Sequence, residues 1–324
     1  MHCGLFGFNP KEYSLRKVLL ENYYILVLGD SIEWGQGLRE DEKYYSVVKR
    51  YIQERFRDRE VHIVVLAHSG ATIGIGDHTK MTSLFGEIPK SYPTILQQCV
   101  DFEGIANCID LVLANGGLND INARTILNPF ESDPALLELV NNYFYRDMKL
   151  LLTKIVSKYY KARLVFSGYY PLVGEKSDLH NLGLLLVAIG VLVGGPVGGA
   201  GAILLDVLGK ESMVRRSRIF ATESTKKLNQ SVKEVNASIS PTMPTISLAI
   251  PNFGEENAVF ASDPWVFGIN PDLSSEDSIA DSRSKECDRL GLTGVDAIVC
   301  KKASICHPNS KGAKEYARVI ISLL

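Results

Sequence analysis

Short apolar runs, separated by longer stretches with helical periodicity, constrain the fold of this chain most. The runs cover residues 23–28, 61–67, 109–114, 163–167 and 245–250. Runs of this length without polar alternation are typical of strands that are buried on both faces of a parallel sheet. The intervening stretches predict helices at about 40–57, 93–103, 134–160, 211–238 and 310–323. Strands that alternate with helices predict an open α/β domain with helices on both faces of the sheet.

Length and charge narrow the classes of protein that this chain can represent. The 324 residues, 46% of them hydrophobic, are enough for one large core. The net charge is −2 and the calculated pI is about 6.3, so we expect no nucleic-acid partner. No repeat or low-complexity linker divides the chain, and we therefore predict a single domain over residues 1–324. The sequence leaves the oligomeric state open.

The N-terminal segment and the cysteines bear on the compartment. The segment lacks a basic region followed by an apolar stretch and a cleavage site, so a cytoplasmic location is expected. None of the six cysteines forms a CxxC pair, which argues against a zinc site. We expect Cys99 and Cys108 to be buried free thiols. The cluster of Cys287, Cys300 and Cys306 permits disulfides, but the missing signal segment argues against them.

Two candidate functional residues follow the first two predicted strands. Ser31 stands in Gly29-Asp30-Ser31 directly after the first strand, where ligands of parallel α/β domains bind. Its backbone N–H can point toward an anion. Gly70, in Ser69-Gly70 after the second strand, allows the backbone to approach a ligand closely. Considered separately, each is also compatible with an ordinary turn.

Two further candidates lie later in the chain. Asn119 follows the third strand in Gly117-Leu118-Asn119-Asp120, and its side-chain amide can donate hydrogen bonds at the same sheet edge. The alternative for Asn119 is a helix cap. His307 precedes the last predicted helix, and it can accept the proton that a serine hydroxyl must lose before it attacks a carbonyl. A lone histidine there is also compatible with a capping or surface role.

The ordered set is more specific than its members, because the chain resembles the SGNH (GDSL) hydrolase family over nearly its whole length. The matching blocks are GDSIEWGQGL, SGAT, GGLNDIN and HPNSKGAKEYA. The resemblance implies a flavodoxin-like, three-layer α/β/α fold with a central parallel five-stranded sheet. It also implies ester hydrolysis without a metal or an organic cofactor.

The resemblance implies a role for each block. Ser31 would be the nucleophile that carries the acyl group, and His307 would be the general base. The backbone N–H groups of Ser31 and Gly70, with the side chain of Asn119, would form the oxyanion hole. Asp30 would support the turn around the nucleophile. Apart from the resemblance, we expect Asp120 to have a supporting role and His68, beside Ser69 at a strand end, to line the pocket. Trp34, three residues after Ser31, is compatible with a place in the pocket and equally with a packing role.

One position departs from the family pattern. Family members usually carry an aspartate three residues before the histidine, and this chain has Ser304 there. Three explanations remain open. A backbone carbonyl near Ser304 or Ile305 holds the ring in a Ser–His dyad, which we favour. Alternatively, Asp296 or an acid of the 254–290 loop such as Asp263 reaches the ring, or the enzyme is impaired.

An apolar insertion at about 175–210 sets this chain apart. Residues 182–205 form a stretch of 24 residues without a charge, which is long enough for one membrane span. A span is disfavoured because the strand at 245–250 and His307 must rejoin the domain that holds Ser31. A hairpin of two short helices fits better, since glycines and a proline interrupt the stretch. It could be a lid, a membrane-surface contact, an oligomer interface or a buried helix pair.

The insertion is the reason to expect a lipid or other acyl ester as substrate. Two alternatives remain: an acyltransferase that uses the same Ser–His site, and a non-catalytic, membrane-associated binding protein on this scaffold. A flavin-binding protein is a more distant alternative. The sequence does not give the acyl-chain length or the alcohol portion of the substrate.

Overall fold

The computed structural model describes most of the chain. The described residues are 21–74, 86–89, 93–178, 181, 209–269 and 277–324. The predicted insertion at 182–205 therefore lies outside the described residues. Among those that are described, no helix is both long enough and apolar enough to span a bilayer.

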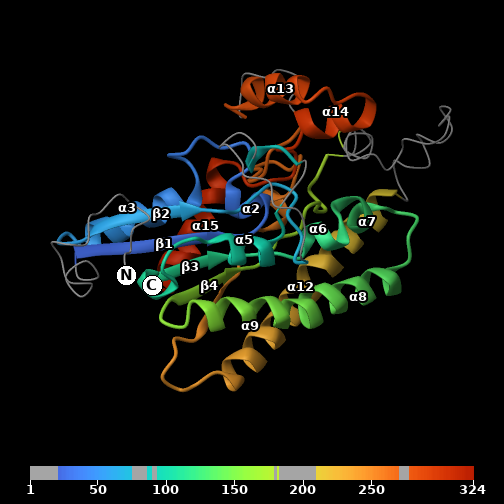
Figure 1. The fold of residues 1–324 in the computed structure, drawn as a ribbon. Coiled ribbons are helices and arrows are strands. Elements are labelled where there is room, and N and C mark those ends of the chain that lie inside the picture. The colour runs from blue at the N-terminus through green and yellow to red at the C-terminus, as the bar shows by residue number, and fades with distance from the viewer. Residues whose placement is uncertain (1–20, 75–85, 90–92, 179–180, 182–208, 270–276) are drawn as a thin grey trace.

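Five parallel strands form the central sheet (Figure 1). They are β1 (Asn22–Leu28), β2 (Glu60–Val65), β3 (Leu111–Ala114), β4 (Arg163–Ser167) and β5 (Ile246–Ala249). Their order in the sheet is β2-β1-β3-β4-β5, and every neighbouring pair is parallel. This is the flavodoxin-like order, so the predicted fold class is confirmed. All five strands coincide with the predicted apolar runs to within two residues at each end.

Helices cover both faces of the sheet. The described helices are α2 (Ser31–Trp34), α3 (Tyr44–Arg55), α5 (Ile95–Asp101), η2 (Ala106–Cys108), α6 (Leu118–Ile121), α7 (Ala123–Leu127), α8 (Asp133–Asn141), η3 (Asn142–Asp147), α9 (Met148–Lys158), α12 (Lys210–Ser238), η5 (Glu255–Asn257), α13 (Ala280–Arg289), α14 (Gly294–Lys301) and α15 (Ser310–Ser322). Helices α5, α9 and α12 pack together on one face, and α3 and α15 pack together on the other (Figure 1). The result is the predicted three-layer arrangement.

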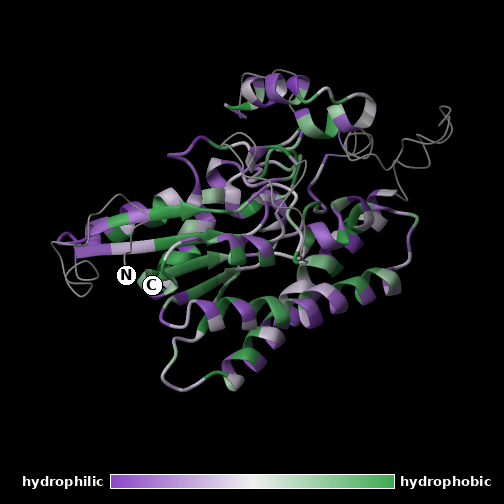
Figure 2. Cartoon of the chain, viewed as in Figure 1, coloured by the Kyte–Doolittle hydropathy of each residue, from purple (hydrophilic) through white to green (hydrophobic). Residues whose placement is uncertain are grey.

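The core lies between these layers. The strands are apolar throughout their central parts, whereas the outer helices carry one apolar and one polar side (Figure 2). In β1, residues Ile25 to Leu28 have no exposed surface, and β3 is equally buried. Burial on both faces explains why these strands are continuous apolar runs. The long helix predicted at 134–160 is α8 and α9 joined by the π-helical segment η3.

The cysteines correct the expectation of free thiols. Cys287 of α13 and Cys300 of α14 form a disulfide, with their Cα atoms 6.0 Å apart. Cys108, which we predicted to be a free thiol, is also disulfide-bonded. Cys99 is free and buried, as expected, and Cys306 is free as well. The expectation for Cys287 and Cys300 was wrong because it was drawn from the compartment, whereas α13 and α14 form a cluster with Ile88 that is too small to hold two helices by burial alone. The expectation for Cys108 was wrong because apolar surroundings do not distinguish a free thiol from a bonded one.

Candidate active site

The turn after β1 presents Ser31 at the carboxyl end of the sheet. Gly29 has a φ of +148°, and a Cβ at this position would lie 2.3 Å from Oδ1 of Asn115, so only glycine fits. The N–H of Gly29 donates to Oε1 of Gln98 at 2.7 Å, and the N–H of Asp30 donates to the same Asn115 oxygen at 3.0 Å. Residues from two neighbouring elements therefore fix the backbone directly before Ser31.

Asp30 is held as a structural acid beneath the turn. Its carboxylate accepts hydrogen bonds from the N–H of Ile32 at 2.9 Å, from Nδ2 of Asn115 at 2.8 Å and from the hydroxyl of Tyr169 at 2.5 Å. It caps the short helix α2, of which Ser31 is the first residue. Burial raises the pKa of Asp30, and the hydrogen bond from Tyr169 opposes that shift. The three donors occupy both carboxylate oxygens, and none of them belongs to His307.

The loop before α15 brings His307 to Ser31. Nε2 of His307 lies 2.6 Å from Oγ of Ser31, although 276 positions separate the two residues. Nδ1 of His307 lies 3.1 Å from the carbonyl oxygen of Ile305. A carbonyl can only accept, so Nδ1 carries the proton and Nε2 is left as the acceptor for the Ser31 hydroxyl.

Backbone hydrogen bonds with Phe267 fix the backbone around His307. The N–H of Phe267 donates to the carbonyl of His307 at 2.8 Å, and the N–H of Cys306 donates to the carbonyl of Phe267 at 2.9 Å. Cys306 has a φ of +63°, an uncommon conformation for a residue with a side chain. The hydroxyl of Tyr170 donates to the Cys306 carbonyl at 2.7 Å and supports this turn. Strained backbone of this kind is concentrated at functional sites.

Burial determines the charge of His307. It lowers the pKa of His307 to about 4, while the carbonyls of Ile305 and Ser304 raise it and Arg283 lowers it further. The ring is therefore neutral near pH 7, with a free lone pair on Nε2. This is the state that a general base requires.

Among the described residues, no carboxylate contacts His307 in place of the aspartate that the resemblance implies. Ser304 occupies its position, but its hydroxyl donates to Oδ2 of Asp277 and does not contact His307. Asp263 forms an exposed ion pair with Lys311. The group within hydrogen-bond distance of Nδ1 is the Ile305 carbonyl, which is the arrangement of the dyad alternative.

The other predicted donors flank the Ser31 turn. Gly70 has a φ of +78°, and it lies in a turn where the N–H of His68 donates to the carbonyl of Gly29 at 3.0 Å. Within the described part of the chain, the N–H groups of Ser31 and Gly70 have no hydrogen-bond acceptor. Nδ2 of Asn119 donates one hydrogen to the carbonyl of Ala71 at 3.0 Å, which leaves its second hydrogen for a ligand.

The three remaining candidates, Asp120, His68 and Trp34, form hydrogen bonds within the fold. The carboxylate of Asp120 accepts from the N–H of Ile73 at 3.1–3.2 Å, and burial raises the pKa of Asp120 to about 6. Nδ1 of His68 lies 2.7 Å from the carbonyl of Ser69, and the residue is only 2% exposed. Nε1 of Trp34 donates to Glu87 at 2.7 Å.

Sequence reasoning missed a buried charged cluster beside this site. Glu87, Asp277 and Arg283 meet between the Ser31 turn and the His307 loop. Each is a single charged residue in a loop or a short helix, and up to 196 positions separate them. No local pattern marks them. In the described residues, no group of three or more His, Cys, Asp or Glu side chains is placed to hold a metal ion.

Comparisons with known proteins find similarity to solved structures in the overall fold. No protein-family model matches the chain, and a search of curated proteins finds no match. Among solved structures, an extracellular lipase from Streptomyces rimosus is 14% identical, with 93% of this chain and 100% of that chain covered and a TM-score of 0.48. A phospholipase A1 from Streptomyces albidoflavus NA297 is 12% identical, with 93% and 99% covered and a TM-score of 0.48.

A putative arylesterase from Agrobacterium tumefaciens str. C58 is also similar. It is 14% identical, with 93% of this chain and 97% of that chain covered and a TM-score of 0.43. At these identities and TM-scores, the similarities decide neither the substrate nor the role of any residue. The function proposed below depends on the geometry of the site.

Proposed function

We propose that this chain is a carboxylic ester hydrolase of the SGNH type, with Ser31 as nucleophile and His307 as general base. The observation that carries the proposal is the 2.6 Å separation between Nε2 of His307 and Oγ of Ser31. A nucleophile within hydrogen-bond distance of a base that is itself oriented by a third group is the recurring arrangement of covalent acyl transfer. Here the third group is the Ile305 carbonyl.

The proposed reaction has two halves. Oγ of Ser31 attacks the ester carbonyl while its proton passes to Nε2 of His307, and the tetrahedral intermediate carries a negative oxygen. His307 then gives the proton to the departing alcohol, which leaves an acyl group on Ser31. A water molecule, deprotonated by His307, attacks this ester, and His307 returns the proton to Oγ of Ser31 as the acid is released. Each proton is exchanged through the same nitrogen.

The proposed oxyanion hole combines three donors from three strand ends. The N–H groups of Ser31 and Gly70, which lack acceptors in the described residues, and the second amide hydrogen of Asn119 would bind the negative oxygen. Donors of this kind typically contribute about 3–4 kcal/mol each to stabilisation of the transition state. Their fixed backbone and side-chain contacts support the proposal, because preorganised donors need no rearrangement during the reaction.

A lipid or other long acyl ester is the proposed substrate class. This part of the proposal depends on the apolar sequence 182–205, which lies outside the described residues. Contact of that segment with a membrane surface is part of the same proposal. A panel of p-nitrophenyl esters from acetate to palmitate would test it, with a preference for long chains expected. A preference for acetate would contradict the lipid-ester proposal and leave the Ser31–His307 chemistry in place.

The disulfides bear on the compartment. Disulfides form and persist in oxidising environments and are rare in the cytosol. The Cys287–Cys300 bond and the bonded state of Cys108 support a location outside the cytoplasm and weigh against the cytoplasmic expectation. Thiol labelling in denaturant without reductant, which exposes the buried thiols, would test this: only Cys99 and Cys306 among the described cysteines should react.

Labelling with a fluorophosphonate probe tests the central proposal. Wild type should carry the adduct on Ser31, located by mass spectrometry, and Ser31→Ala and His307→Ala should carry none. A well-folded wild type that is not labelled and turns over no ester would overturn the proposal in favour of a binding protein. If product analysis with an added alcohol shows ester exchange in place of hydrolysis, the enzyme is an acyltransferase that uses the same acyl-enzyme.

A further inference from the structure

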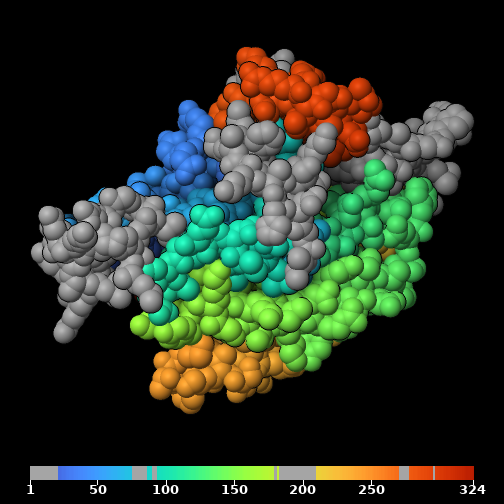
Figure 3. Space-filling view, viewed as in Figure 1, coloured from blue at the N-terminus to red at the C-terminus, as the bar shows by residue number. Residues whose placement is uncertain are grey.

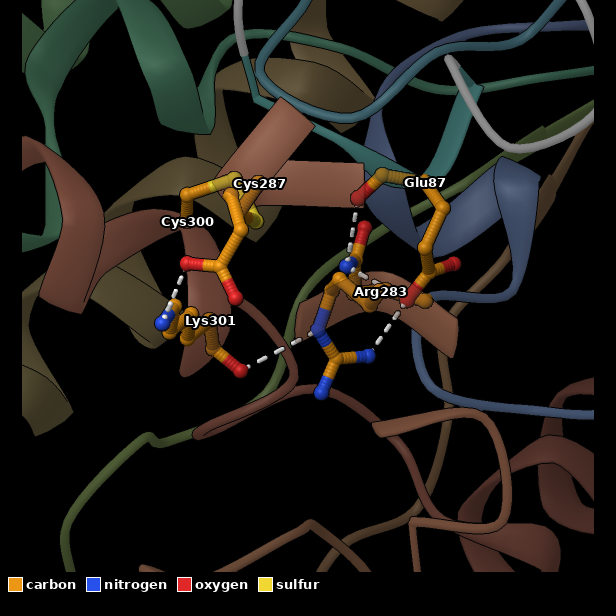
Figure 4. The surroundings of a disulfide bond; sticks show 7 residues. Glu87, Arg283, Cys287, Cys300 and Lys301 are labelled. Carbon is orange, nitrogen blue, oxygen red and sulfur yellow. Dashed lines mark hydrogen bonds and ion pairs between the residues drawn. A yellow bond between two sulfur atoms is a disulfide. The ribbon is translucent and has the colours of Figure 1, made fainter. Parts of the chain in front are cut away.

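A buried cluster of three charged side chains lies next to the proposed active site. Arg283 of α13 is 1% exposed, and its guanidinium forms ion pairs with Glu87 and with Asp277, which are buried as well. Nη1 of Arg283 lies 2.7 Å from Oε1 of Glu87. Nε of Arg283 donates to the carbonyl of Lys301 at 3.2 Å (Figure 4). The guanidinium therefore joins α13 to two other segments of the chain.

On one side, the cluster holds the turn that carries Ser31. The Glu87 carboxylate accepts from Nε1 of Trp34 at 2.7 Å, from Nε2 of Gln36 at 2.7 Å and from the N–H of Gly37 at 2.9 Å. All three donors lie within six residues of Ser31 in the sequence. One carboxylate thus anchors both the end of α2 and the loop that follows it. The position of that carboxylate is set in turn by Arg283.

On the other side, the cluster holds the loop that carries His307. Nη2 of Arg283 lies 3.3 Å from Oγ of Ser304, and the Ser304 hydroxyl donates to Asp277. The Ser304 carbonyl accepts from the N–H of His307 at 2.9 Å. The next residue, Ile305, provides the carbonyl that orients the His307 ring. The same guanidinium therefore contacts the supports of both members of the Ser–His pair.

The disulfide fixes the helix from which Arg283 projects. Arg283 and Cys287 are four residues apart on α13 and both are 1% exposed, so they share its buried face. Cys300, the disulfide partner, directly precedes Lys301, whose carbonyl accepts from Arg283. The side chains of α13 and α14 form one continuous layer at one end of the molecule (Figure 3). The disulfide therefore links the helix that carries Arg283 to the helix that carries the Lys301 carbonyl, its acceptor.

Stability alone does not explain this cluster. Removal of charges from water is costly, and replacement of a buried ion pair by apolar residues of similar volume is often neutral or stabilising. The cluster instead provides directional contacts, which apolar side chains lack. Its donors and acceptors reach Gly37 and Trp34 on one side and Ser304 on the other.

We propose that Arg283 is a positioning residue that sets the distance between Ser31 and His307. It acts through Glu87 on the Ser31 turn and through Ser304 and Asp277 on the His307 loop, with its helix fixed by the Cys287–Cys300 disulfide. The inference rests on the proposed function, because it assigns a purpose to the alignment of the Ser–His pair. Arg283 contacts neither member directly and takes no part in proton transfer.

The main variant of the test removes all three charges of the cluster together. Loss of the guanidinium alone would leave two buried carboxylates, so Arg283→Met is combined with Glu87→Gln and Asp277→Asn. Arg283→Lys is the conservative variant, since it keeps the charge but lacks the planar fork of donors. Arg59→Met is the matched control. Arg59 pairs with Asp110 at 3.2 Å, at the edge of the sheet opposite to the site.

Two measurements distinguish a loss of alignment between Ser31 and His307 from a loss of folding. The first is the rate of fluorophosphonate labelling at Ser31, with kcat and KM for a p-nitrophenyl ester. The second is the titration of the His307 ring by NMR in protein with ¹³C-labelled histidine, which requires no enzymatic activity. We expect the triple variant to lose about 10–100-fold in labelling rate and kcat, with KM changed less than about twofold. Burial is the main cause of the low pKa of His307, whereas the charges of Arg283, which lowers it, and Asp277, which raises it, oppose each other. If the triple variant loosens the packing around the ring, the pKa of His307 should move from about 4 toward 6.5, and Arg283→Lys should fall between.

Two results would count against the inference. A triple variant with wild-type labelling and an unchanged His307 titration would overturn it. An equal loss in Arg59→Met at the same unfolding free energy would reduce Arg283 to a structural role and also overturn it. If the wild type itself is not labelled, the proposed hydrolase function fails. The NMR titration then decides separately whether Arg283 positions His307.

Discussion

Nε2 of His307 lies 2.6 Å from Oγ of Ser31, and these two residues come from opposite ends of the chain. Ser31 follows the first described strand and His307 precedes the last helix. The parallel sheet makes the meeting possible, because the carboxyl ends of its strands share one edge and the final loop returns to that edge. The pair is therefore a consequence of topology, and its chemistry depends on the protonation state of His307.

The pH profile of the reaction should have an unusually acidic limb. His307 must be neutral to accept the Ser31 proton, and burial lowers the pKa of His307 to about 4. Protonation occurs below this pKa, so kcat/KM should stay constant from pH 8 to about 5 and fall to half near pH 4. The value from kcat/KM refers to the free enzyme. Initial rates at each pH, with the folded fraction followed by circular dichroism, provide the measurement. A limb near pH 6.5 would contradict the burial of the ring.

Loss of Asn119 should reduce turnover more than substrate binding. Asn119→Ala removes one proposed oxyanion donor, and the expected loss in kcat is about 10²–10³-fold, with KM nearly unchanged. The variant also loses the hydrogen bond to Ala71, which typically contributes about 1 kcal/mol to stability. Asn141→Ala is the control, because Asn141 accepts from Lys227 on the outer helices. A change confined to KM would place Asn119 outside the oxyanion hole.

The strands and the site blocks were predictable for a common physical reason. Continuous burial gives β1 and β3 a local apolar pattern, and Ser31 and Gly70 stand in the turns that must follow such strands. The contacts of Arg283 with Glu87 and Asp277 were not predictable, since they depend on how distant loops meet. The Ile305 carbonyl was predicted as one alternative only, because every residue has a backbone carbonyl and none is visible as special in a sequence.

Helix α13 was also not predictable from the sequence. We described 254–290 as a loop, but α13 begins at Ala280 within it. The helix is strongly polar and has few buried residues, so the apolar periodicity that marks a helix is nearly absent. The disulfide and the Arg283 contacts join this helix to the rest of the fold. Both are tertiary features that local sequence patterns do not record.

Glu33 should make folding depend on pH. It is fully buried behind the Ser31 turn, and burial raises the pKa of Glu33 well above its usual value, with Asp30 adding to the shift. A raised pKa means that the folded state holds the proton more tightly, so stability falls as pH rises above about 4.5.

The variant Glu33→Gln has no proton to lose. The unfolding free energy of Glu33→Gln should therefore increase relative to that of wild type as pH rises, by up to about 1.4 kcal/mol per pH unit. Urea unfolding of both proteins at pH 5 and pH 8 measures this difference. If the unfolding free energies of the two proteins change in parallel with pH, the side chain of Glu33 has access to water or to a cation.

An aspartate at position 304 should not improve the proposed hydrolase activity. Ser304 is buried, and its hydroxyl donates to Asp277. Ser304→Asp would place a second carboxylate against Asp277 and remove that donor, whereas Nδ1 of His307 is already paired with Ile305.

We expect Ser304→Asp to lower the unfolding free energy by about 1–3 kcal/mol and to slow labelling at Ser31. Ser304→Ala, which removes the donor without adding charge, is the comparison and should be less affected in labelling. A faster rate in Ser304→Asp would mean that the side chain at 304 can reach His307. The Ile305 carbonyl would then be a substitute for a missing acid.

The Cys287–Cys300 disulfide should stabilise the α13–α14 pair. It closes a loop with a sequence separation of 13, for which a chain-entropy estimate gives about 3 kcal/mol. The double variant Cys287→Ala/Cys300→Ala should therefore unfold with a free energy lower by about 2–4 kcal/mol, measured in urea without reductant. Reductant is unsuitable here because Cys108 is also disulfide-bonded. Cys99→Ala removes a buried free thiol without a cross-link, so it controls for the lost side-chain packing. An equal loss in Cys99→Ala would show that packing, and not the cross-link, holds the two helices together.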